Sequence, residues 1–217
     1  MSGIICLTWY ITNLINPMKA LKIIGIVVVA LIMVAVVAIA FISPRSHMER
    51  SIVISGTPTS VLEEFSNFKK FNEWSPWSQM DPDAKYTFEG PDSGVGAKMS
   101  WDGPKSGKGS QETVEYEPGK RVKNLMKFDV MEGAMYSEIF VEEVAEGTKV
   151  TWTYDQDVSG TAPMNAAIGK LFGLGMDGMM GKQYEEGLNA VKKIVESKPA
   201  EPQPEVAPAD STVSQPQ

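Results

Sequence analysis

The sequence predicts one α+β domain, in which a seven-stranded, curved antiparallel sheet wraps around a long C-terminal helix, preceded by one transmembrane helix. Three observations predict this. An apolar run lies near the N-terminus, short stretches of alternating apolar and polar residues fill the middle, and a long stretch with helical spacing of apolar residues closes the folded part. An open sheet must bury its apolar face, and the closing helix is long enough to cover it.

The apolar run extends from Ile23 to Ile42, and Gly25 is its only residue that is not clearly apolar. At about 1.5 Å per residue, a helix of this length spans about 30 Å, the thickness of the hydrocarbon core of a bilayer. The alternatives are a buried core helix and a cleaved signal peptide, and the second has support because Ala38-Ile39-Ala40 fits a small-x-small cleavage pattern. A cleaved apolar segment is usually only about 7–15 residues long, so we predict an uncleaved, single-pass anchor.

The orientation of this anchor depends on its flanking charges. Two lysines precede the span and two arginines follow it, so the charge bias is nearly balanced. Met18, followed by Lys-Ala-Leu-Lys, resembles a natural start, which would make residues 1–17 of the N-terminal segment 1–22 an extension. With that start, a free amine joins the two lysines. The positive-inside tendency then favours a cytoplasmic N-terminus and an extracytoplasmic domain.

Residues 43–196 are predicted to form the folded domain, and residues 197–217 a disordered tail. The tail contains five prolines and scarcely any large apolar residue. It therefore cannot bury enough surface to offset the entropy lost on ordering.

The domain begins with the alternation Arg50–Ile54, which predicts a strand. Thr57 follows as a helix N-cap, with Pro58 at the first helical position, and the predicted helix runs to Phe65. A second short helix is predicted over Phe68–Glu73.

Six further alternating stretches predict the remaining strands. They are Lys85–Glu89, Ala97–Trp101, Ser110–Tyr116, Arg121–Phe128, Met135–Val144 and Lys149–Asp155. Turn residues separate them, notably Gly103-Pro104, Pro118-Gly119, Glu132-Gly133 and Glu146-Gly147. Such turns connect hairpins, so the sheet is predicted to be an antiparallel meander.

The closing helix is predicted over Met164–Val195. Its apolar residues at helical spacing are Ile168, Leu171, Met176, Met179, Leu188, Val191 and Val195. Within it, Gly173–Gly178 matches the letters G-x-G-x-x-G, but a dinucleotide site needs a preceding strand in a parallel βαβ unit. We interpret these small residues as a place where the helix approaches the sheet closely or is loosened locally.

Several local motifs follow one another in a fixed order. They are Glu49-Arg50-Ser51-Ile52-Val53-Ile54, Trp74-Ser75-Pro76-Trp77 with Asp81-Pro82, Gly94-Val95-Gly96-Ala97 leading to Trp101, Gly107-Lys108-Gly109, Gly147-Thr148-Lys149-Val150-Thr151-Trp152, and Gly173-Leu174 with Met176-Asp177. In this order, and with these elements, the region Met48–Val195 resembles the START-like (SRPBCC), helix-grip superfamily, in particular its polyketide cyclase/dehydrase-type branch.

The resemblance implies a cavity between the concave sheet and the long helix. Across the superfamily such cavities bind lipids, sterols and polyketides, and in some members they catalyse reactions. The superfamily has no shared set of catalytic residues, so the resemblance assigns no catalytic role here.

Composition argues against several functions. Acidic residues outnumber basic ones, 27 to 20, and the pI is about 4.9, so no broad cationic surface is available for nucleic acid. Cys6 and His47 are the only residues of their types, so one chain can build neither a disulfide framework nor a His/Cys zinc cluster. We expect no metal and no cofactor. Because His47 precedes the first predicted strand, we expect no histidine base in the domain.

The predicted ligand-binding residues are large, adaptable apolar side chains, which suit a pocket for an apolar molecule. They are Trp77, Met99, Trp101, Met126, Trp152, Tyr154, Met176 and Met180. Strand phase predicts that Ala97, Met99 and Trp101 face inward, as do Val150, Trp152 and Tyr154, because their alternates are polar. The alternative is that these residues form an ordinary core.

The phase of Ser110–Tyr116 is ambiguous. One choice directs Glu112, Val114 and Tyr116 inward, and the other directs Gln111, Thr113 and Glu115 inward. Either choice can place a carboxylate on the concave face, where burial raises its pKa and suits it to acid or base chemistry. Glu112, Glu115 and Tyr116 are therefore the catalytic candidates, unless these carboxylates lie at a solvated rim.

Together these features favour a membrane-anchored binding module whose partners are a hydrophobic small molecule, lipid-like or polyketide-like, and the lipid bilayer. Two alternatives stay open. One is an enzyme of cyclase, dehydratase or hydrolase type that uses a cavity carboxylate and a tyrosine. The other is an interaction domain whose interior is plain core.

Overall fold

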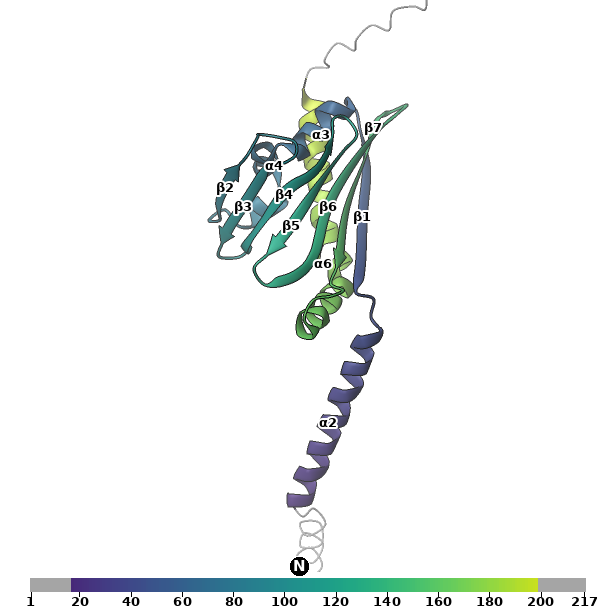
Figure 1. Ribbon diagram of the computed structural model, residues 1–217. Coiled ribbons are helices and arrows are strands. Elements are labelled where there is room, and N and C mark those ends of the chain that lie inside the picture. The colour runs from purple at the N-terminus through teal and green to yellow at the C-terminus, as the bar shows by residue number, and fades with distance from the viewer. Residues whose placement is uncertain (1–16, 199–217) are drawn as a thin grey trace, which may run out of the picture.

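The computed structural model describes residues 17–198, so the first residues of the N-terminal segment and nearly all of the predicted tail lie outside the described residues. The elements are α2 (Pro17–Phe41), β1 (Arg45–Ile54), α3 (Pro58–Ser66), α4 (Phe68–Trp74), α5 (Pro76–Met80), β2 (Lys85–Glu89), β3 (Lys98–Gly103), β4 (Gly107–Glu117), β5 (Arg121–Phe128), β6 (Met131–Val144), β7 (Gly147–Asp157) and α6 (Pro163–Ser197). Figure 1 shows α2 extending from one end of the domain.

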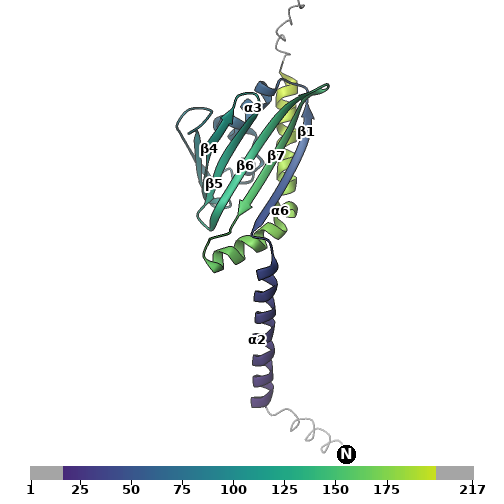
Figure 2. The same cartoon turned by 45° about the vertical axis from the view of Figure 1, so that its right-hand side comes forward.

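The seven strands form one antiparallel sheet in the order β1-β7-β6-β5-β4-β3-β2. Six strands follow each other as a meander, and β1 closes the sheet by pairing with β7 from Arg45↔Asp157 to Ile54↔Thr148. The sheet curves around α6 (Figures 1 and 2). The predicted fold class, a helix-grip α+β architecture with one N-terminal apolar helix, is confirmed.

The core lies between the concave face of the sheet, α3 to α5 and the second half of α6. Its centre is the buried indole of Trp152, whose ring lies 4.2 Å from Tyr184 and 5.3 Å from Phe65, measured between centroids. The indole of Trp74 packs edge-on at 6.1 Å from Trp152 and donates to the carbonyl of Glu64 at 3.2 Å. Aromatic pairs of this geometry add to the stability from area burial alone.

The start of α3 is as predicted: the Thr57 hydroxyl accepts from the Ser60 amide at 3.2 Å, and Pro58 occupies the first turn. One helix was not predicted. Pro76 begins α5, a single short turn that the sequence pattern presents only as a break, because proline favours the first helical position as well as loops.

Strand β1 is longer than predicted, since it begins at Arg45 rather than Arg50. The added part is mostly polar and shows no apolar alternation. Ion pairs with β7, in place of apolar contacts, hold this part of β1 in the sheet. Arg45 Nε lies 2.9 Å from Asp157, and His47 Nδ1 lies 2.7 Å from Asp155. His47 therefore belongs to the domain, contrary to our expectation.

One predicted turn is misplaced. The turn between β5 and β6 lies at residues 129–130, and Gly133 falls inside β6 with a φ of 122°. A side chain at Gly133 would meet the Asp157 carbonyl at 2.8 Å, so glycine here permits close strand contact rather than a reversal.

Helix α6 is buried along its second half, at Tyr184, Leu188, Val191 and Val195. Its glycines behave in two ways. In the segment where we predicted a close approach or a loosening, a Cβ at Gly173 would meet the Ser46 hydroxyl of β1 at 2.8 Å, whereas a Cβ at Gly178 would meet nothing within 4 Å. Gly187, which was not singled out, also lies close to the sheet, since a Cβ there would meet Trp152 at 2.9 Å. In the first half Met176 is buried, but the predicted apolar residues Ile168, Leu171 and Met179 are exposed.

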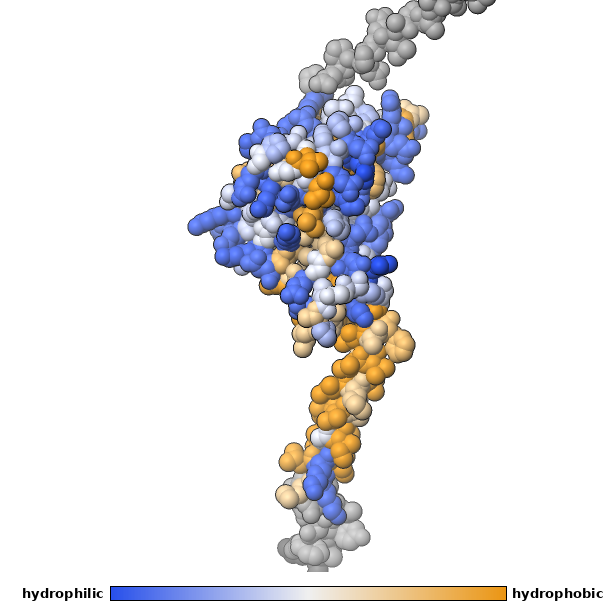
Figure 3. Space-filling view, viewed as in Figure 1, coloured by the Kyte–Doolittle hydropathy of each residue, from blue (hydrophilic) through white to orange (hydrophobic). Residues whose placement is uncertain are grey.

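Helix α2 is long and apolar enough over Met18–Phe41 to cross a membrane, and none of its most apolar stretch is buried within the described structure. Figure 3 shows it as an apolar rod below a domain whose visible face is mostly hydrophilic.

Candidate functional site

A cavity of about 670 Å³ lies between the concave face of the sheet, the short helices and α6. This volume falls within the range of about 300–1,000 Å³ that is typical of small-molecule sites. Because β3 to β7 each turn alternate side chains to the concave face, their inward residues form one side of the wall, and the short helices and α6 form the rest of it together with β2 and the β3–β4 turn.

The structure brings together seven of the eight predicted ligand-binding residues in this wall. They are Trp77, Met99, Trp101, Met126, Trp152, Tyr154 and Met180. The eighth, Met176, is 1% exposed and packs in the core instead. The predicted inward phase agrees with the burial of Met99 on β3, of Ala97 just before β3, and of Val150, Trp152 and Tyr154 on β7.

Further wall residues were not among the predicted ligand-binding residues. The apolar ones are Phe71, Met80, Tyr86, Phe128, Met131, Phe172, Met179 and Tyr184, and the polar ones are Ser75, Ser78, Asp81, Lys105, Ser106, Gln111 and Ser137. A signal existed for Tyr184 and Phe172, since they lie four residues after and eight residues before Met180 and so share one face of α6.

The ambiguity over β4 is resolved by a β-bulge. Gln111 and Thr113 are buried on the concave side, and the register then shifts between Thr113 and Glu115, so that Tyr116 pairs with buried Val122. A bulge places two residues opposite one and so reverses the phase. Neither single phase therefore applies to the whole strand.

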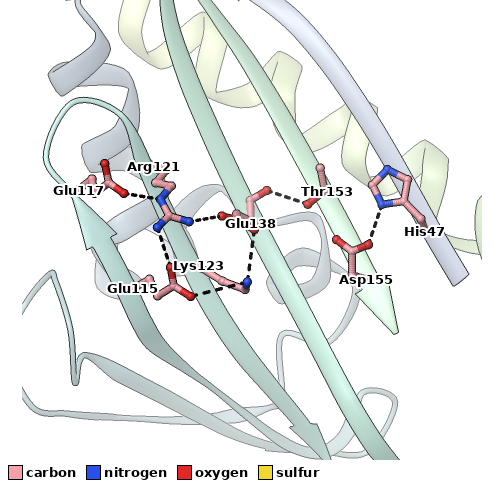
Figure 4. Close-up of polar contacts among 8 residues, drawn as sticks. All are labelled: His47, Glu115, Glu117, Arg121, Lys123, Glu138, Thr153 and Asp155. Atoms are coloured by element: carbon pink, nitrogen blue, oxygen red, sulfur yellow. Dashed lines mark hydrogen bonds and ion pairs between the residues drawn. The ribbon is translucent and has the colours of Figure 1, made fainter. Parts of the chain in front are cut away.

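The structure places none of the three catalytic candidates in the cavity wall. Glu112 alternates with the two buried residues and faces the outer side, and Tyr116 packs against the core. Glu115 joins an ion-pair cluster on the outer face (Figure 4), where Arg121 Nη2 lies 2.7 Å from it.

Arg121 is the centre of that outer cluster. Its guanidinium also pairs with Glu117 at 2.6 Å and with Glu138 at 2.9 Å. The hydrogen bond from Arg121 lowers the pKa of the Glu117 carboxyl group. His47 and Asp155 lie nearby on β1 and β7 (Figure 4), and their hydrogen bond raises the pKa of His47. These charged groups stabilise the outer face of the sheet and do not reach the cavity.

The polar groups of the cavity wall come from several elements. The Trp152 indole donates to the Ser137 hydroxyl at 2.8 Å. Burial raises the pKa of Tyr184, outweighing a hydrogen bond with Ser137 that lowers it, and burial also raises the pKa of Tyr154. Both phenols therefore stay protonated at neutral pH and can donate hydrogen bonds. On β4, Gln111 places an amide in the wall.

Asp81 is the carboxylate of the cavity wall. Its Oδ2 accepts from the Lys105 amide at 2.9 Å and from the amide and hydroxyl of Ser106, each at 2.7 Å, which fixes the β3–β4 turn. Desolvation raises the pKa of Asp81, but these hydrogen bonds and Lys105 outweigh it and lower the pKa overall. The other oxygen, Oδ1, is buried without a hydrogen-bond partner among the described residues. The carboxylate is therefore ionised at neutral pH, with one free acceptor.

Comparison with known proteins agrees with this geometry. Residues 45–196 match the family described as polyketide cyclase / dehydrase and lipid transport. A search of curated proteins finds no sequence match. Among solved structures, a protein from Rhodobacter sphaeroides shares 12% identity at a TM-score of 0.50, over 71% of this chain and 94% of its own.

Two other structural neighbours each cover 70% of this chain. The Aha1 dimer from Colwellia psychrerythraea shares 15% identity at a TM-score of 0.49, over 70% of this chain and 96% of its own. The di-domain ARO/CYC protein StfQ of the steffimycin biosynthetic pathway shares 12% identity at a TM-score of 0.48, over 70% of this chain and 51% of its own. At these identities the likeness concerns the fold alone.

Proposed function

Because this chain belongs to the polyketide cyclase / dehydrase and lipid transport family, we propose that it is a membrane-anchored module that binds a hydrophobic small molecule in the cavity. The cavity is the observation that carries the proposal. It has the volume of a ligand site, walls of tryptophan, phenylalanine, tyrosine and methionine, and a small set of polar groups. Methionine walls adapt to ligands of varied shape.

The membrane part of the proposal concerns α2. Its apolar length, its position ahead of the domain and the absence of any buried face support a helix that lies in a bilayer rather than in a protein core. The domain is then held beside the pool of apolar molecules in the membrane. We propose a cytoplasmic N-terminus and an extracytoplasmic domain, from the flanking charges alone.

The polar groups suggest the shape of the ligand. The wall contains the hydrogen-bonding side chains of Ser78, Gln111 and Ser137, which favours a ligand that brings a hydrogen-bond donor into the cavity. The aromatic and methionine side chains of the wall favour a ligand that is otherwise apolar. We therefore propose a lipid-like or polyketide-like molecule with at least one hydroxyl.

Binding is tested with the full chain in detergent micelles, using a fluorescent long-chain alcohol and its methyl ether, which lacks the donor. We expect saturable binding of both, with the alcohol bound more tightly. Binding stabilises the fold by mass action, by about 2.7 kcal/mol at a hundredfold excess over Kd. If neither probe binds saturably, the proposal is refuted.

A pair of variants on β5 separates ligand volume from ordinary core. Met126→Trp adds bulk in the cavity wall, whereas Leu125→Trp adds the same residue type on the outer face of the same strand. If the cavity holds the ligand, Met126→Trp weakens binding without lowering the melting temperature, and Leu125→Trp leaves binding unchanged. Overpacking of a filled core would instead cost roughly 1–3 kcal/mol in Met126→Trp.

A further inference from the structure

The first half of α6 carries a row of apolar side chains that no other part of the described structure covers. Met164, Ile168, Leu171, Leu174 and Met179 are 72, 48, 51, 68 and 57% exposed. Their spacing places them on one side of the helix, which we call the exposed face of α6.

This part of the helix is also almost free of charge. Lys170 and Asp177 are the two charged residues between Pro163 and Met180, and both side chains form hydrogen bonds. Lys170 Nζ donates to two carbonyls in the last turn of α2, at 3.3 and 3.4 Å, and Asp177 accepts from Arg50 at 2.7 Å.

The side opposite the exposed face packs on the domain, where Gly169 and Met176 are buried. The segment is thus apolar nearly all round but buried on one side only. A helix of this composition is normally covered on every side, by protein or by lipid.

The position of the segment indicates which of these covers it. Helix α2 ends at Phe41 and β1 begins at Arg45, so three residues join them, and three extended residues reach only about 10 Å. The hydrogen bonds of Lys170 join α6 to the same end of α2. Figure 2 shows the first part of α6 running across the end of the domain next to α2, transverse to that helix.

We propose that residues 163–180 of α6 lie in the surface of the lipid bilayer, with the exposed face immersed between headgroups and acyl chains, and that the ligand cavity opens there. The inference rests on the proposed function, which places α2 in the bilayer. Amphipathic helices that lie in this interface bury their apolar side about 5–10 Å deep.

The cavity mouth lies at the same end of the molecule. Met179 is 57% exposed and yet contributes to the cavity wall, as does Met80, which is 52% exposed. Because the strands alternate in direction, the β3–β4 and β5–β6 turns lie at the end of the sheet where β1 begins (Figure 1). Lys105 of the β3–β4 turn and Met131, which begins β6 directly after the β5–β6 turn, therefore rim a mouth that faces the membrane. An apolar ligand could pass from the acyl chains into the cavity without crossing water.

The occupant we infer is a lipid surface recognised by apolar contact rather than by headgroup charge. Asp129 in the β5–β6 turn and Glu132 at the start of β6 would oppose anionic headgroups, and Lys170 is held by α2. A zwitterionic phosphatidylcholine bilayer is therefore the appropriate probe.

The test uses the full chain in phosphatidylcholine vesicles, with Cys6→Ser so that one introduced cysteine carries a spin label. The label is placed at Leu171→Cys, and the matched control is Glu186→Cys, on the exposed side of the second half of the same helix. We expect the label at position 171 to be more accessible to oxygen than to a water-soluble nickel chelate, and the label at 186 to show the reverse.

Two results would overturn the inference. One is a label at position 171 that is as accessible to the nickel chelate as the label at 186. The other is a label shielded from both reagents, with spin–spin broadening that disappears on dilution with unlabelled chain, because a second copy would then cover the face.

The alcohol-binding measurement in micelles keeps the two proposals separate. Saturable binding together with a water-exposed position 171 would refute the membrane docking alone. A lipid-exposed position 171 without saturable binding would refute the ligand function alone.

Discussion

Two glycines of α6, Gly178 and Gly187, should respond in opposite ways to replacement by alanine. Alanine is favoured over glycine in a helix by about 0.8–1 kcal/mol. At Gly178 a Cβ would meet nothing within 4 Å, so Gly178→Ala should raise the free energy of unfolding by about that amount. At Gly187 a Cβ would lie 2.9 Å from the Trp152 ring and 3.2 Å from the Trp74 ring.

These two rings cannot easily give way. The Trp152 indole is held by Ser137 at 2.8 Å and the Trp74 indole by the Glu64 carbonyl at 3.2 Å, and the rings pack on each other. Overpacking of such a core costs typically 1–3 kcal/mol. Because both variants gain the same helix propensity, their difference isolates that cost, and Gly187→Ala should be less stable than Gly178→Ala by about 1–3 kcal/mol.

The assay is equilibrium urea unfolding of the full chain in detergent micelles, followed by tryptophan fluorescence. The parent and both variants are compared provided that their unfolding free energies depend equally on urea concentration, so that a shift in midpoint reports a change in stability. Equal midpoints for the two variants would refute the reasoning, since the helix could then withdraw from the rings at no cost.

Three further predictions concern other parts of the molecule. The Ser159 hydroxyl and amide, together with Arg45, lower the pKa of Asp157 to about 2 from 3.8, so the stability contributed by its ionised form is full above about pH 4 and lost as the pH falls to about 2. The destabilisation caused by Asp157→Asn, measured by denaturation across this window, should shrink accordingly; a constant difference would contradict the linkage. Ser137→Ala leaves the buried Trp152 N–H without its acceptor and should lower the free energy of unfolding by about 1–3 kcal/mol, whereas an unchanged melting temperature would show that the bond is dispensable. Carbonate extraction should leave the full chain in the membrane pellet and release a chain that begins at Arg45; release of the full chain would argue against a spanning α2.

Sequence periodicity predicted the strands and their phase where each strand alternates without interruption. On β7 the alternates of Val150, Trp152 and Tyr154 are polar, so burial of one face follows directly from the pattern. On β4 the pattern could not decide, because the bulge at residues 113–115 depends on pairing with β5 and reverses the phase within the strand.

The candidate site was predictable to the extent that its residues are large and apolar. Met176 shows the limit, because a methionine on the core side of α6 has the same spacing signal as one that lines the cavity. Asp81 shows another limit, since its role depends on the turn at Lys105 and Ser106, which lies far from it in sequence. Helical spacing likewise could not distinguish Leu171, which is exposed, from Val191, which is buried.

The three-residue connection between α2 and β1 also limits how far the domain can move from the end of α2. With α2 in a bilayer, the domain can rotate and diffuse laterally but can rise from the surface by only about 10 Å, the reach of three extended residues. Ligand encounter then becomes a two-dimensional process whose rate depends on the ligand's density in that one membrane. Transfer to a second membrane would need the two bilayers to come into near contact, or a separate soluble carrier.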